Sequence, residues 1–130
     1  MTRKKITMKF NNRFSGELIA ERGKANVGIE ENTLEPYDML LGALGSCYYS
    51  TFLDVANKKR INFDYAEIFI EGEKRETSPA TLKWVKLKLT AKNSSNNLGL
   101  EKAAALAAKY CSVYVTVSMV ADISWEIKFE

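Results

Sequence analysis

The sequence predicts a mixed α+β fold with the element order βββ-α-ββ-α-β. Apolar and polar residues alternate in several short segments, a pattern typical of strands with one buried face. Two longer segments, residues 36–59 and 98–111, are instead rich in apolar residues over the length of a helix. The chain has 130 residues and no repeat or linker, so we expect a single domain spanning residues 1–130.

The first third of the chain predicts three antiparallel strands joined by tight turns. Asn11–Asn12 and Arg22–Gly23 are the candidate turns, and Arg13 then begins the second strand. The alternating positions that define the apolar face are Ile6, Met8 and Phe10, then Phe14, Gly16, Leu18 and Ala20, then Ala25, Val27 and Ile29.

The next segment predicts a long helix from Pro36 to about Lys59. Proline is favoured in a first helical turn, and Lys58, Lys59 and Arg60 suit the negative end of the helix dipole. Between Met39 and Leu53 the helix is apolar nearly all the way round. Such a helix must be buried on every side, so we expect a partner subunit to cover what one chain cannot.

The remaining elements follow from the same patterns. Residues 66–71 and 85–90 alternate as two strands around the turn "ETSPAT", and "KNSSNN" forms a polar loop. "LGLEKAAALAAKYC" predicts an alanine-rich helix that ends near Cys111. Residues 122–129 alternate again and predict the last strand.

Composition excludes several classes of function. The net charge is only +3, and the basic clusters at residues 3–5 and 58–60 suit solvated ends of elements better than a nucleic-acid surface. No apolar run has the length of a membrane span, and the N-terminus has no apolar signal core. We therefore expect a cytoplasmic protein that binds neither nucleic acid nor membrane.

The absence of histidine narrows the chemistry further. It excludes Ser-His and Cys-His catalysis, and the two cysteines alone cannot complete a zinc site. We expect no metal and no cofactor. Cys47 and Cys111 are too far apart in sequence for a C-x-x-C redox pair, so one interpretation is two buried thiols that pack as small hydrophobic groups.

The surroundings of Cys47 permit a second interpretation. Gly42 and Gly45 precede it in the long helix, where each glycine costs about 1 kcal/mol relative to alanine. Either these small residues let another helix pack closely, or the helix breaks there. A break would put Cys47 in the first turn of a new helix, where the thiol pKa is lowered.

Two sequence motifs carry a family resemblance. "EPYDMLLGALGSC" and, further on, "AAKYCSV" resemble segments of the OsmC/Ohr family of thiol-dependent hydroperoxide reductases. The likeness extends over nearly the whole chain, because the order of elements agrees as well. The resemblance implies an intertwined homodimer whose long helices are buried between sheets.

The resemblance also implies roles for individual residues. Cys47 would be the peroxidatic cysteine, Cys111 the resolving cysteine, and an external dithiol the reductant. In the better-characterised members an acid directly follows the proline. Here Tyr37 occupies that position and Asp38 comes one residue later, as in a less characterised branch.

The family's activating arginine has two candidates in the N-terminal segment, Arg13 and Arg22. We favour Arg13, because a strand end is held more rigidly than the tip of a turn. We expect reduction of organic hydroperoxides in oxidative stress defence. The alternative is a non-catalytic domain of the same fold that binds a small apolar molecule at the dimer interface.

Overall fold

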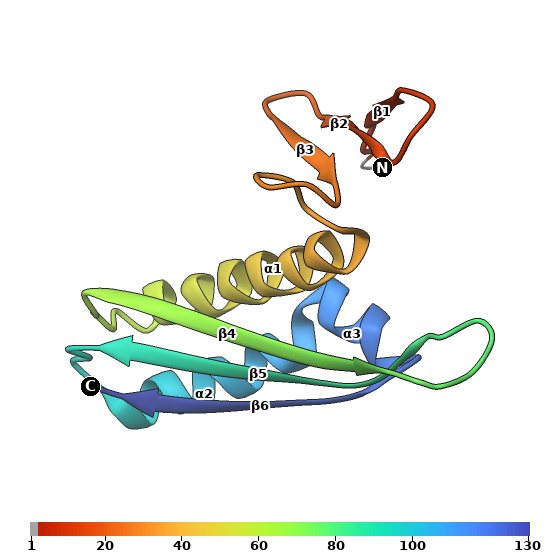
Figure 1. Ribbon diagram of the computed structural model, residues 1–130. Coiled ribbons are helices and arrows are strands. Elements are labelled where there is room, and N and C mark those ends of the chain that lie inside the picture. The colour runs from red at the N-terminus through yellow and green to blue at the C-terminus, as the bar shows by residue number, and fades with distance from the viewer. Residues whose placement is uncertain (1–2) are drawn as a thin grey trace. The chain divides into compact units, whose positions relative to one another are not determined.

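The computed structural model describes residues 3–130 and confirms the predicted element order, with one short helix added near the C-terminus (Figure 1). The chain divides into two compact units, one ending at Leu41 and one comprising Gly42–Glu130. The long helix α1, Pro36–Lys58, contains the boundary between them.

The N-terminal unit is a three-stranded antiparallel sheet in the order β1-β2-β3. Its strands are β1 (Thr7–Phe10), β2 (Ser15–Ile19) and β3 (Lys24–Gly28). The two-residue turn predicted at Asn11–Asn12 is wrong: residues 11–14 form the connection, so Arg13 lies in a loop and does not begin β2. The Asn11 side chain accepts a hydrogen bond from the Arg13 backbone N–H at 2.8 Å. The rings of Phe10 and Phe14 also stack across this loop, with centroids 5.9 Å apart.

The second unit is built on a sheet in the order β4-β5-β6, with β4 at Tyr65–Lys74, β5 at Leu82–Lys92 and β6 at Asp122–Phe129. β5 is antiparallel to β4 and parallel to β6. A parallel pair needs a long crossover connection, and the helices α2 (Asn97–Tyr110) and α3 (Ser112–Ser118) provide it. Helix α3 was not predicted, and the predicted helix 98–111 ends one residue earlier, at Tyr110.

The core of this unit lies between one face of the sheet and the helices (Figure 1). Each helix contributes one stripe of buried residues, and β5, the central strand, contributes alternate positions. The buried set includes Leu44, Tyr48, Phe52 and Ala56 of α1, Val85, Leu87, Leu89 and Ala91 of β5, and Leu100, Ala103, Ala104 and Ala107 of α2. In the part of the chain that the structure describes, no helix is long and apolar enough to cross a membrane.

Helix α1 is continuous through both glycines, so the predicted break before Cys47 is wrong. Gly45 instead permits close packing, since a Cβ atom built there would lie 2.7 Å from Cδ1 of Ile70 on β4. The contact is therefore made with a strand and not with another helix. Among residues 3–130, a Cβ on Gly42 would meet no atom within 4 Å apart from its own stretch of helix.

The contact between Gly45 and Ile70 predicts an energetic coupling. We expect Gly45→Ala alone to give little or no stabilisation, because the overlap with Ile70 offsets the gain of about 1 kcal/mol from helix propensity. Ile70→Val removes Cδ1. In that background Gly45→Ala should stabilise the protein by about 1 kcal/mol more than it does in the unaltered chain, which is a favourable coupling between the two positions. Urea unfolding of the four proteins measures it.

Ile68→Val is the matched control, since Ile68 lies on the same strand and no Ile68 atom is within 4 Å of the built Cβ. Coupling of equal size in both backgrounds would contradict the assignment of Gly45 to this contact.

Candidate functional site

The structure brings Cys47 and Cys111 together from two different parts of the second unit. Cys47 lies in the middle of α1 and is half-buried, while Cys111 is fully buried at the junction between α2 and α3. The two side chains are close enough to affect each other's ionisation, and both are free thiols. A half-buried and a buried thiol close together are suited to sequential chemistry, in which one thiol meets a reagent and the other attacks the product.

Cys47 is held in place by its neighbours on α1. The Tyr48 side chain is fully buried, and its hydroxyl donates a hydrogen bond to the Ala104 carbonyl of α2 at 2.9 Å. The Tyr48 ring also stacks on Tyr114 of α3, with centroids 5.9 Å apart. Thr51 donates its hydroxyl to the Cys47 carbonyl at 3.1 Å. These contacts fix α1 against both helices of the crossover.

Cys111 is fixed just as firmly, because it ends one helix and begins the next. Its backbone N–H donates to the Ala107 carbonyl of α2 at 2.8 Å, and its carbonyl accepts from the Val115 N–H of α3 at 3.0 Å. Its sulfur accepts from the Tyr114 N–H at 3.4 Å, so the thiol serves as the N-cap of α3. Its backbone is extended, which is typical of an N-cap.

The surroundings of Cys47 favour its thiolate form. Burial by itself raises the pKa of Cys47, but hydrogen bonds to the sulfur from the Val113 backbone N–H and the Cys111 thiol, among others, outweigh it and lower the pKa below the ordinary value. Hydrogen bonds to the charged form of a group stabilise that form. Cys47 therefore ionises more readily than an ordinary cysteine.

Cys111 is affected in the opposite direction. Burial raises the pKa of Cys111, and its position as hydrogen-bond donor to Cys47 raises it further, although the Tyr114 N–H partly offsets both. When the pair loses one proton, that proton therefore leaves Cys47 and Cys111 keeps its own. Because the two thiols are close together, their ionisations are coupled and only the first produces a thiolate readily. This asymmetry distinguishes a nucleophile from its partner.

The source of activation differs from the one that the sequence predicted. Cys47 does not lie at the start of its own helix. The backbone N–H groups that face its sulfur come instead from Ser112 and Val113, the first residues of α3. The physical principle, stabilisation of a thiolate by N–H groups at a helix start, is retained, but the helix is a different one.

The other three predicted site residues lie in the N-terminal unit. Asp38 is in the first turn of α1, and its carboxylate accepts a hydrogen bond from the Glu35 backbone N–H at 2.8 Å, which caps the helix. Arg13 lies in the loop between β1 and β2, and Arg22 in the turn between β2 and β3; both are exposed. Their proposed roles beside Cys47 stay predictions.

Sequence reasoning missed Tyr48 and Tyr114 as supports of the site. Burial raises the pKa of both phenols, so they are neutral hydrogen-bonding and packing groups rather than acids. The available signal was the position of Tyr48 directly after Cys47, one turn from the apolar positions Leu44 and Phe52. A buried tyrosine hydroxyl needs a partner, and that partner could not be identified without the fold.

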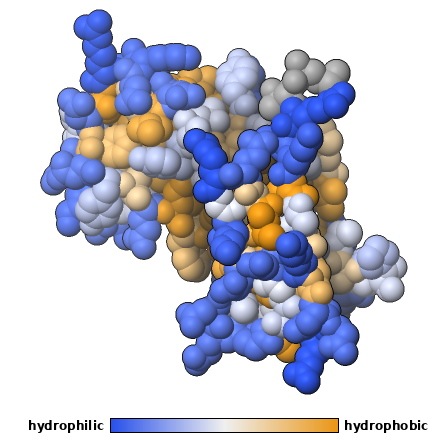
Figure 2. All heavy atoms as spheres, turned by 90° about the horizontal axis from the view of Figure 1, so that it is seen from above, coloured by the Kyte–Doolittle hydropathy of each residue, from blue (hydrophilic) through white to orange (hydrophobic). Residues whose placement is uncertain are grey.

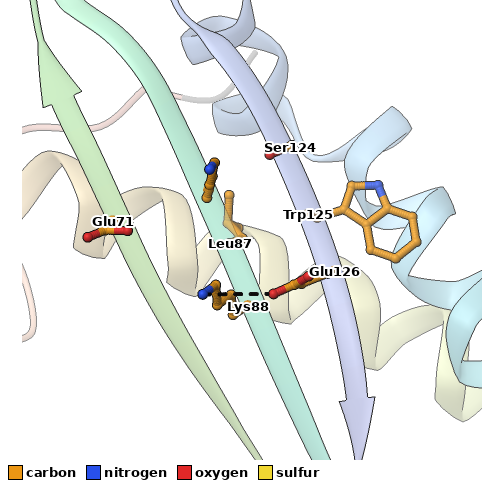
Figure 3. Close-up of a pocket in the computed structure, with 7 residues that line it drawn as sticks. Glu71, Leu87, Lys88, Ser124, Trp125 and Glu126 are labelled. Atoms are coloured by element: carbon orange, nitrogen blue, oxygen red, sulfur yellow. Dashed lines mark ion pairs between the residues drawn. The ribbon is translucent and has the colours of Figure 1, made fainter.

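A second concave region lies on the opposite face of the β4-β5-β6 sheet (Figure 3). Its labelled side chains include Glu71, Lys88 and Glu126, and the last two form an exposed ion pair at 4.0 Å. An exposed pair of this kind contributes roughly 0–1 kcal/mol. The lining of this region contains no cysteine, whereas Cys47 has a lowered pKa, so the cysteines are the better candidate site. Within residues 3–130, no group of three or more His, Cys, Asp or Glu side chains could hold a metal ion.

Comparison with solved structures supports the same fold. A hypothetical protein from Aquifex aeolicus VF5 is 29% identical, with a TM-score of 0.86 over 100% of this chain and 99% of that one. An OsmC-like protein from Mycoplasma pneumoniae is 17% identical, with a TM-score of 0.87 over 98% and 97% of the two chains. The organic hydroperoxide resistance protein OhrB of Bacillus subtilis is 17% identical, with a TM-score of 0.71 over 98% of each chain.

No curated protein matches the sequence. The family comparison is decisive, because residues 29–126 match the OsmC-like protein family, and this segment contains both cysteines and all the elements that position them. The chain therefore belongs to the OsmC-like protein family.

Proposed function

We propose that this protein reduces organic hydroperoxides with Cys47 as peroxidatic cysteine and Cys111 as resolving cysteine. The observation that carries the proposal is the asymmetry of the two neighbouring thiols. Burial raises the pKa of the half-buried Cys47, but hydrogen bonds to its sulfur outweigh burial and lower that pKa. Burial raises the pKa of the fully buried Cys111. Attack on peroxide requires a thiolate with access to the reagent, and resolution requires a second thiol within reach.

The proposed first step is attack by the Cys47 thiolate on the distal oxygen of R–O–OH. A sulfur–oxygen bond forms as the O–O bond breaks, and the alkoxide leaves with a proton as the alcohol R–OH. Sulfur is oxidised by two electrons to a sulfenic acid, and the peroxide is reduced by the same two electrons.

In the second step Cys111 attacks the sulfenic sulfur. A disulfide forms and the sulfenic oxygen leaves as water, taking the thiol proton with it. The Cys111 thiol lies near Cys47, as its effect on the pKa of Cys47 indicates, so the resolving thiol is within the same site. An external dithiol then reduces the disulfide by thiol–disulfide exchange, which restores both cysteines.

The substrate class is supported by two proteins of similar structure. The Bacillus subtilis neighbour is named an organic hydroperoxide resistance protein, as is a neighbour from Elizabethkingia anophelis. Two free thiols are typical of a reducing compartment, so we propose that this activity belongs to oxidative stress defence in the cytoplasm.

A cation and an acid complete the proposal. A guanidinium group can bind both a thiolate and a peroxide oxygen, and Arg13 and Arg22 are the two candidates for this role. Asp38 would orient that guanidinium. The exposed side chains of Arg13 and Arg22 are free to take part in an assembly of two chains.

We further propose that the functional form is a homodimer. Among residues 3–41, Val27 is the one large apolar side chain that is buried, whereas Ile6, Phe10 and Ile29 are 58%, 47% and 74% exposed. A three-stranded sheet of this size has too small a core to be stable without cover. Apolar atoms are also visible among the hydrophilic ones on the face shown in Figure 2. A second copy supplies the cover most simply.

The pKa asymmetry predicts selective alkylation. Because the Cys47 pKa is lowered, its thiolate should be present, and iodoacetamide should react, at a pH below the ordinary thiol pKa of about 8.5. Cys111, whose pKa is raised by burial, should react only at higher pH. The two cysteines fall in different tryptic peptides, since Lys58 and Lys109 lie between them, so mass spectrometry follows each separately.

Protein unfolded in urea is the control, and there both thiols should titrate together. Equal reactivity of the two in the folded protein, or faster reaction of Cys111, contradicts the assignment. That outcome favours the alternative of a non-catalytic domain that binds an apolar molecule.

The mechanism predicts different defects for the two cysteine variants. Cys47→Ser should abolish consumption of an organic hydroperoxide in the presence of excess dithiol. Cys111→Ser should consume one equivalent and then stall, because its sulfenic acid has no resolving thiol and oxidises further. Peroxide assays combined with intact mass measurement distinguish a disulfide from added oxygen. Full turnover by Cys47→Ser would refute the mechanism.

The dimer proposal predicts an assembly that does not dissociate at working concentrations. We expect sedimentation at micromolar concentration to give twice the chain mass, with an interface that buries more than ~2,000 Å² and has an apolar centre. A folded monomer under these conditions is the contrary result.

A further inference from the structure

Ser112 is the residue directly after Cys111, and it is the only side chain besides Cys111 for which the structure gives a hydrogen bond to the Cys47 sulfur among the described residues. Its Oγ lies 4.0 Å from the Cys47 Sγ. The distance suits a hydrogen bond to the large sulfur atom, and either atom could be the donor when Cys47 is a thiol. Once Cys47 is a thiolate it has no proton, so the serine hydroxyl must donate.

The position of Ser112 is fixed by the surrounding backbone. It is the first residue of α3, and its carbonyl accepts a hydrogen bond from the Thr116 hydroxyl at 2.9 Å. The preceding residue is tied to α2 by the bond from its N–H to the Ala107 carbonyl. Tyr48, next to Cys47, is hydrogen-bonded to α2 as well. Both Cys47 and Ser112 are therefore held in position by contacts of their neighbours with α2.

We propose that the Ser112 hydroxyl is a hydrogen-bond donor that activates the Cys47 thiolate for its reaction with peroxide. This role rests on the proposed function for its purpose, although its effect on Cys47 can be measured without any peroxide. A donor to the charged form lowers the pKa of the acid, and the Ser112 hydroxyl adds to the backbone N–H groups in this way. The hydroxyl can also turn away or accept a hydrogen bond as the sulfur changes state, which a backbone N–H cannot do.

Two of the hydroxyl residues near Cys47 in the sequence have other partners. Ser46 donates its hydroxyl to the Ala43 carbonyl at 3.2 Å, and Thr51 donates to the Cys47 carbonyl at 3.1 Å, so both are used within α1. Ser118, at the end of α3, donates to the Val115 carbonyl. Ser112 is the one whose hydroxyl reaches the sulfur.

The test is the pH midpoint of Cys47 alkylation in four proteins: the unaltered chain, Ser112→Ala, Ser112→Thr and Ser118→Ala. Ser112→Ala should raise the midpoint by about half a unit, which is about threefold less thiolate at pH values below it. Ser112→Thr keeps a hydroxyl on the same carbon and should restore the original midpoint. Ser118→Ala removes a hydroxyl from the same helix and should leave the midpoint unchanged.

An unchanged midpoint in Ser112→Ala overturns the proposal, as does a midpoint in Ser112→Thr that matches alanine. An equal shift in Ser118→Ala also overturns it, because the effect would then come from α3 as a whole. The peroxidase proposal is judged separately, by whether an organic hydroperoxide oxidises Cys47 in the unaltered protein. A midpoint shift without peroxide oxidation leaves the role of Ser112 as an activator standing and refutes only the substrate.

Discussion

The hydrogen bond from the buried Tyr48 hydroxyl to the Ala104 carbonyl is the constraint on which the site depends. It joins α1 to α2 at the residue next to Cys47, so the cysteine cannot turn about the helix axis without breaking it. The same ring packs against Tyr114 of α3, close to the residue that caps that helix. One side chain therefore sets the position of the nucleophile relative to both helices that surround it.

The difference between the two thiols follows from this arrangement and not from the cysteines themselves. Burial raises the pKa of each, but only Cys47 receives enough donors to reverse the effect. Cys111 is itself one of those donors, and the backbone N–H groups of Tyr114 and Val113 that face its own sulfur do not outweigh its burial. The donors belong to a junction between two helices, where backbone N–H groups have no partner within their own helix. The helix junction is thus the structural reason that an isolated pair of thiols becomes a thiolate and a thiol.

Much of the fold could be predicted from the sequence, because alternation and helix length are local properties. The strands of both sheets and the long helix follow from them. The connection at residues 11–14 was mispredicted because Asn11 and Phe14 stabilise a longer loop through side-chain contacts that a turn propensity does not include. Helix α3 was missed because "SVYVTVS" is rich in β-branched residues, and its helical form depends on packing of Tyr114 and Val117. The cysteine pair could be predicted from the resemblance, but the identity of its donors required the tertiary structure.

Gly45, two residues before Cys47, has a physical explanation that differs from a helix break. A cysteine in mid-helix has no free backbone N–H groups of its own helix nearby, so its activation must come from another element. That element must be held at a fixed distance, which requires α1 to lie close to the sheet and crossover. Gly45 permits this approach on the strand side by leaving room for Ile70. The residue that weakens the helix locally therefore improves its packing, and an unbroken helix is a more rigid support for a nucleophile than a helix start would be. Activation of Cys47 is in this way a property of the packed unit, and it should be lost whenever α3 loosens from α1.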